Sequence, residues 1–103
     1  MKLTKKVIRE VNDKTNCGID DEGDYYSIYV DNSCGEDFTF EINKGETEVE
    51  DIISYCEDFD VGEHFKLWYG ANRGEPSDAR VLMDNCEEIE SNLNELRELL
   101  ERI

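Results

Sequence analysis

Two segments in the first half of the chain alternate strictly between apolar and polar residues. Their apolar positions are Tyr26, Ile28, Val30, Phe38, Phe40 and Ile42. Successive side chains of a strand point to opposite faces of a sheet, so residues 25–31 and 37–43 predict strands with one apolar face each. Residues 16–20 predict a short strand before them. The turn residues between these segments favour an antiparallel three-stranded meander.

Apolar residues recur at helical spacing on both sides of the predicted sheet. Residues 3–11 carry them at i, i+4, i+5 and i+8, and Thr4 is placed to cap this helix. Residues 47–59 predict another helix, and Thr47 and Glu50 form a capping-box pattern at its start. Its apolar stripe consists of Val49, Ile52, Ile53 and Cys56.

The segment 59–69 fits two patterns. Apolar residues at positions 61, 65 and 68 lie at helical spacing, whereas those at positions 65, 67 and 69 alternate as in a strand. We favour a short helix, because Asp60 and Glu63 form a second capping-box pattern. The composition of residues 70–76 predicts a loop.

The last quarter of the chain carries the most regular pattern. Its apolar positions step by three and four residues: Ala79, Leu82, Cys86, Ile89, Leu93, Leu96, Leu100 and Ile103. Asp84 and Glu87 form a third capping-box pattern, so we expect the long C-terminal helix to begin there, after a short helical turn from Ser77 to Met83. We favour a monomer in which this stripe packs on the sheet. The alternative is a homodimer through residues 86–103.

Together these elements predict one domain of the α+β class over residues 1–103. An N-terminal helix precedes the three-stranded antiparallel meander, and two or three helices follow it. No run of about eighteen apolar residues predicts a transmembrane helix, and the N-terminus lacks the apolar core of a signal peptide. We therefore expect a protein of the cytoplasm of a host bacterial cell, without membrane contact.

Acidic residues are concentrated in the middle of the chain. Residues 17–65 contain sixteen acidic residues and one basic residue, Lys44, in a chain with a formal net charge of −16. Aromatic and β-branched residues are interleaved with these carboxylates, so the segment can bury a core. The sequence therefore predicts a folded, strongly anionic surface. We expect the basic N-terminal helix to balance this acidic body rather than to bind nucleic acid.

The chain shows no motif for catalysis. His64 is the single histidine, and no serine or cysteine has the sequence context of a nucleophile. The acidic cluster at residues 20–24 has glycine fourth rather than sixth, unlike a calcium-binding EF-hand loop, and predicts a solvated hairpin tip. We expect no enzyme, no cofactor and no metal. The cysteines lack the close pairs typical of a zinc site and are expected to be buried or half-buried free thiols: Cys17, Cys34, Cys56 and Cys86.

Two classes of function fit this sequence. The first is an inhibitor that presents carboxylates in place of phosphates, occupies the basic channel of a nucleic-acid-binding enzyme and binds no nucleic acid itself. The second is a small acidic accessory or adaptor protein, dimeric through its C-terminal helix. The uneven distribution of charge favours the first, because acidity that serves solubility can be spread evenly. The residues expected to bind the protein partner are Asp37, Glu41, Glu48, Asp51, Asp58, Tyr25, Tyr29 and Tyr55.

Several segments resemble the small acidic proteins encoded by phages and integrative elements of Gram-positive bacteria. These segments are Glu36–Phe40, Phe59–Asp60 with Glu63–His64 and Trp68, Pro76–Ser77 with Arg80, and the acidic C-terminal helix. The resemblance covers most of residues 20–103 and supplies no catalytic residues. Several small acidic proteins from such elements inhibit CRISPR effectors or restriction enzymes, some as DNA mimics. The resemblance therefore implies an anti-CRISPR or anti-restriction inhibitor.

Overall fold

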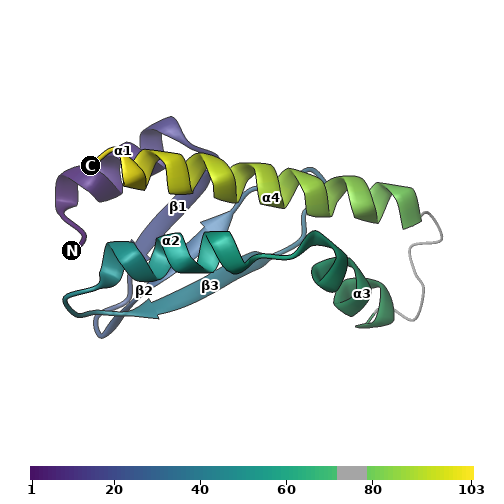
Figure 1. The fold of residues 1–103 in the computed structure, drawn as a ribbon, viewed down its shortest axis with the longest axis horizontal. Helices are drawn as coiled ribbons and strands as arrows, with labels where there is room; N and C mark the ends of the chain where they lie inside the picture. Colours follow the sequence, from purple (N-terminus) through teal and green to yellow (C-terminus); the bar gives the residue numbers. More distant parts are fainter. Residues whose placement is uncertain (72–78) are drawn as a thin grey trace.

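The computed structural model of the chain describes residues 1–71 and 79–103. In chain order its elements are α1 (Lys5–Lys14), β1 (Cys17–Asp21), β2 (Tyr25–Val30), β3 (Phe38–Asn43), α2 (Glu48–Asp58), α3 (Val61–Ala71) and α4 (Ala79–Glu101). Figure 1 shows α2 and α4 side by side in front of the sheet, α1 near the end of α4, and α3 at one end of the molecule. The predicted α+β fold is confirmed, with its N-terminal helix, its meander and its long last helix.

The sheet is the predicted meander, in the order β1-β2-β3 with antiparallel pairing throughout. Its register aligns Ile19 with Ile28 and Ile28 with Phe40, so the apolar side chains of the three strands form one continuous inner face. Gly23 adopts a φ of +98° in the hairpin between β1 and β2, a conformation that favours glycine. The inner face packs against α1, α2 and α4, which supply most of the remaining core.

The apolar stripe of α4 is buried inside the chain. Leu82, Cys86, Ile89, Leu93, Leu96 and Leu100 are each at most 2 % exposed. Most of the stripe belongs to the core that contains the sheet, so it is not available as the seam of a homodimer.

The predicted start of this helix at Asp84 is wrong. Helix α4 begins at Ala79 and continues through Asp84, which is exposed. Residues 79–83 contain good helix formers, and continuing the helix buries Leu82 on the same stripe as Cys86. Burial of Leu82 therefore outweighs the capping-box pattern. The predicted cap at Ser77 lies outside the described residues.

The beginnings of the other helices follow the predictions in part. Thr4 caps α1 by accepting a hydrogen bond from the Val7 amide (3.2 Å). Asp60 caps α3 in the same way, accepting from the Glu63 amide (3.0 Å), and α3 is a helix rather than a strand.

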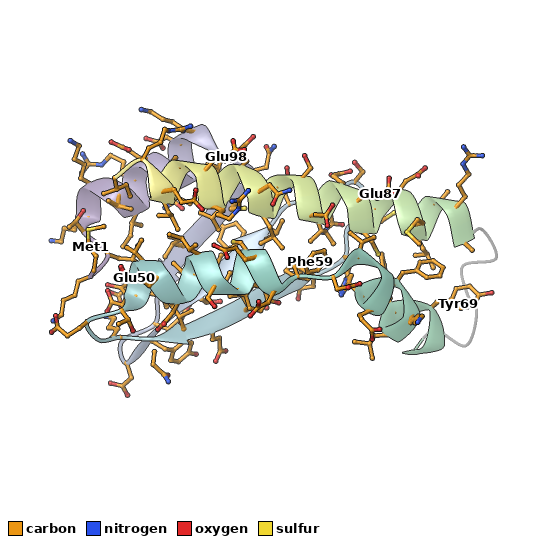
Figure 2. The ribbon with its side chains drawn as sticks, in the orientation of Figure 1. Met1, Glu50, Phe59, Tyr69, Glu87 and Glu98 are labelled. Atoms are coloured by element: carbon orange, nitrogen blue, oxygen red, sulfur yellow. The ribbon has the colours of Figure 1, made fainter. Side chains whose placement is uncertain are left out.

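The predicted capping box of α2 is wrong. Thr47 makes no side-chain hydrogen bond to the helix backbone; its hydroxyl donates to Asp51 Oδ2 instead (3.2 Å). Glu50 pairs with the amino group of Met1 rather than with the backbone of Thr47 (Figure 2). A carboxylate that reaches a cation gains more than one that accepts a hydrogen bond from a neutral amide, which explains the difference. No helix in the described part of the chain is long and apolar enough to cross a membrane.

Candidate functional site

The outer face of the sheet carries four of the predicted partner-binding residues. Asp37 and Glu41 are exposed, and neither forms an ion pair with any described residue. Tyr25 is half-buried and Tyr29 is 39 % exposed. The ring of Tyr29 lies over its register partner Gly18, where a Cβ atom would come within 2.0 Å of Tyr29 Cζ. Gly18 therefore provides the flat backbone surface on which this ring rests.

Three further predicted residues form a stripe on α2 beside β3. Asp51, Tyr55 and Asp58 are spaced at i, i+4 and i+7 and are all exposed. The Tyr55 ring stacks on Phe40 of β3, with centroids 3.7 Å apart and planes 10° from parallel. Partial burial raises the pKa of the Tyr55 hydroxyl, so it stays protonated and can donate a hydrogen bond near neutral pH.

These seven residues come from β2, from β3 with the residue before it, and from α2, and they do not share one face. Glu41 projects from the outer side of the sheet and Asp37 directly precedes β3, whereas Phe40 points inward and contacts Tyr55 on the helical side. β3 is an edge strand, and Tyr25 and Tyr29 belong to the central strand β2 beside it. We call them the β3 rim: Asp37, Glu41, Asp51, Asp58, Tyr25, Tyr29 and Tyr55.

The prediction that Glu48 is an exposed binding residue is wrong. Its side chain is 3 % exposed. Oε1 accepts a hydrogen bond from the Leu3 amide (2.7 Å), and Oε2 accepts one from the Gly45 amide (2.8 Å). The N-terminal segment folds over the first turn of α2, where Val49 also donates to the Met1 carbonyl (2.9 Å). Glu48 is therefore a structural residue that fastens two chain segments to α2.

Sequence reasoning missed an acidic row on the outer surface of α4. Its exposed members include Asp84, Glu87 and Glu98, and Figure 2 shows Glu87 and Glu98 pointing away from the sheet. These residues fall between the apolar positions of the three-and-four pattern, which is the signal that could have identified them. Glu88 and Glu95 of the same helix instead bind the body of the protein, at Ser33 Oγ (2.7 Å) and the Asn16 amide (3.1 Å).

A polar junction joins three elements near α3, and sequence reasoning missed it as well. His64 Nε2 lies 2.8 Å from Glu36 Oε1, and both side chains are at most 20 % exposed. Asn85 of α4 donates to the other Glu36 oxygen at 3.4 Å. The His64 ring also lies 5.2 Å from the Phe38 ring and 5.4 Å from the Phe59 ring. This arrangement positions α3 against the core.

The basic residues of α1 remain separate from the β3 rim. Lys2 lies 3.7 Å from Glu46, but Lys6 and Lys14 form no ion pair within residues 1–71 and 79–103. They border a groove of about 440 Å³ between α1 and the end of α4, together with Arg102. No basic residue within residues 1–71 and 79–103 therefore forms an ion pair with a carboxylate of the rim.

The hairpin tip at residues 20–24 is exposed, as predicted, but the prediction of buried or half-buried thiols is wrong for Cys34. Asp21 accepts hydrogen bonds from Lys44 Nζ (2.7 Å) and from the Gly23 amide (2.9 Å), which lower the pKa of Asp21. The four cysteines are free; Cys34 is exposed and the other three are buried. Burial raises the pKa of Cys17 and Cys56 to about 12 and that of Cys86 to about 11. Among the described residues no cluster of three or more potential metal ligands occurs.

The chain was compared with protein families, curated proteins and solved structures. No family model, no curated protein and no solved structure matches it.

Proposed function

We propose that this protein is a non-catalytic inhibitor that binds the basic nucleic-acid channel of a host defence nuclease, a CRISPR effector or a restriction enzyme, through the β3 rim. One observation carries the proposal: the four carboxylates of the rim are exposed and none has an ion-pair partner among residues 1–71 and 79–103. In a protein with a net charge of −16 they produce a strong negative potential beside an edge strand. The resemblance to small acidic phage proteins supports the same partner class.

The rim is a sparser array of charge than a nucleic acid. Asp37 and Glu41 are four residues apart along an extended chain, or about 13 Å. Asp51 and Asp58 are seven residues apart along a helix, or about 10 Å. Duplex DNA carries one charge per about 1.7 Å of axis. The proposed mode is therefore occupation of selected cationic positions in the channel, with Tyr29 and Tyr55 as aromatic anchors, rather than a copy of the phosphate backbone.

A charge-reversal variant tests this proposal. The triple substitution Asp37→Lys, Glu41→Lys and Asp51→Lys leaves the fold intact, because these side chains are exposed. At about 1 kcal/mol per charge, it weakens inhibition of a verified target nuclease roughly 100-fold. The readout is cleavage of a labelled substrate across inhibitor concentrations, at low and at high salt. Inhibition by the parent protein weakens as salt rises. The parent protein also competes with the nucleic-acid substrate for the nuclease.

A matched variant on α4 separates the rim from net charge. Asp84→Lys, Glu87→Lys and Glu98→Lys change the net charge by the same amount on a different surface. This variant retains inhibition close to that of the parent. Equal losses in both variants would mean that total charge, rather than the β3 rim, is recognised. Full inhibition by the rim variant would refute the proposal.

A further inference from the structure

Helix α3, at one end of the molecule, carries few charges (Figure 1). Two of its eleven residues are acidic or basic, Glu63 and Lys66, against 37 % of the whole chain, so its formal net charge is zero with His64 neutral. Charge depletion of this kind is typical of the core of a protein–protein interface.

The same end exposes apolar side chains. Leu67 is 71 % exposed, Tyr69 is 37 % exposed and Val81 is 45 % exposed. Helix α3 also carries Val61, Phe65 and Trp68, and no apolar side chain from Val61 to Gly70 is fully buried. An aromatic helix with no net charge and no fully buried side chain over these residues is unusual for a surface that faces only water.

The position of α3 suits an end-to-end contact. The molecule measures 42 × 24 × 20 Å, and α3 lies at one end of its long axis, packed against the first turns of α4 (Figure 1). Its outward side presents Glu63 and Lys66, which are 71 % and 75 % exposed and lie 3.9 Å apart. The two charges make this surface complementary to itself, because a second α3 in antiparallel orientation places a lysine beside each glutamate.

We propose that α3 is the contact surface for a second copy of this chain, which forms a symmetric end-to-end dimer. In a two-fold contact the same patch serves both subunits, so Leu67 and Tyr69 of each copy cover the other α3, and each Glu63 meets the other Lys66. This geometry also places the acidic bodies at opposite ends. Charges separated by more than the Debye length of about 8 Å are largely screened at physiological salt, so the acidic bodies oppose this dimer only weakly.

A second copy fits this surface better than the channel of a nuclease does. The outward side of α3 has no net charge, so a cationic channel does not attract it electrostatically. The β3 rim already supplies the acidic surface for such a channel. The inference is therefore independent of the proposed function. Helix α3 has 11 residues and is about 16 Å long. A contact of that length falls at the small end of specific interfaces and predicts a reversible, concentration-dependent dimer.

Sedimentation equilibrium over a range of protein concentrations tests the dimer. The parent protein shows a reversible monomer–dimer equilibrium at physiological salt, in which the dimer fraction rises with protein concentration. Leu67→Glu weakens association at least tenfold while circular dichroism shows an unchanged fold, because the side chain is exposed. Ile103→Glu, the same kind of change at a residue 50 % exposed near the other end of α4, leaves the equilibrium unchanged.

Paired charge variants give the sharpest test. Glu63→Lys and Lys66→Glu each abolish the homodimer, because each leaves charges of one sign on the contact. An equimolar mixture of the two variants restores association as a heterodimer. The inference is overturned if the parent stays monomeric at all concentrations, if Leu67→Glu has no effect, or if the mixture does not associate. A monomeric parent whose binding to a nuclease is weakened by Leu67→Glu would assign the patch to the target instead.

Discussion

Glu48 is a buried side chain that links two chain segments to the first turn of α2. Its side chain is nearly inaccessible and accepts hydrogen bonds from two backbone amides of separate segments. A helical wheel places it on the outer side of α2, and only the course of residues 1–4 over that side explains its burial. Sequence reasoning could not reach this assignment, because Leu3 and Glu48 are 45 residues apart.

Replacement of Glu48 tests its structural role. Glu48→Gln puts an amide group where both oxygens accept hydrogen bonds, so one backbone N–H loses its partner. We expect a loss of about 2–3 kcal/mol in the free energy of unfolding, measured by urea denaturation. Glu46→Gln, at a side chain that is 88 % exposed, changes it by less than about 0.5 kcal/mol. A Glu48→Gln protein as stable as its parent would contradict this account.

The cysteines differ in reactivity for a physical reason. The thiolate is the reactive form, and burial raises the pKa of Cys17, Cys56 and Cys86 to about 12, 12 and 11, respectively. With Ellman's reagent at pH 8 we expect one thiol, that of Cys34, to react quickly in the native protein. All four react after unfolding in denaturant. Cys34→Ser removes the fast phase, and a second rapidly reacting thiol would show that one of the buried sites is open.

At the scale of elements, the regular patterns were predicted well and the junctions were not. The alternation in β2 and β3 and the three-and-four spacing of α4 identify strands and helix because burial of one face dominates their stability. The start of α4 was misplaced because a local cap pattern at Asp84 competes with burial of Leu82. The junction of Glu36, His64 and Asn85 brings together three segments that are distant in sequence. No local sequence pattern predicts such a contact.

A charge placed in the apolar stripe of α4 tests how much this helix contributes to the stability of the fold. Leu93 is fully buried, and Leu93→Glu places an unpaired carboxylate among apolar side chains. We expect a loss of more than about 4 kcal/mol, enough to unfold a marginally stable domain. Circular dichroism and sedimentation would then report an unfolded monomer. Ser91→Glu, an exposed position on the same helix, stays folded, and a folded Leu93→Glu protein would show that the stripe is not in the core.

At the scale of the whole molecule, charge divides the protein into three parts. The β3 rim and the outer surface of α4 are anionic, Lys6, Lys14 and Arg102 border the groove beside α1, and helix α3 has no net charge. The sequence predicted the anionic middle from composition alone, but not that the rim residues do not share one face. Salt tests the proposed rim contact, because it weakens binding through exposed carboxylates.

The unpaired edge of β3 also affects how the protein behaves in concentrated solution. An edge strand offers unpaired backbone groups to any other chain, and natural proteins protect such edges with charged side chains. Here the carboxylates of the rim provide that protection. Near the sequence isoelectric point of about 4.2 the repulsion between molecules vanishes. Mild acid, rather than heat alone, is then the condition that opens a route from this sheet to fibrous aggregates.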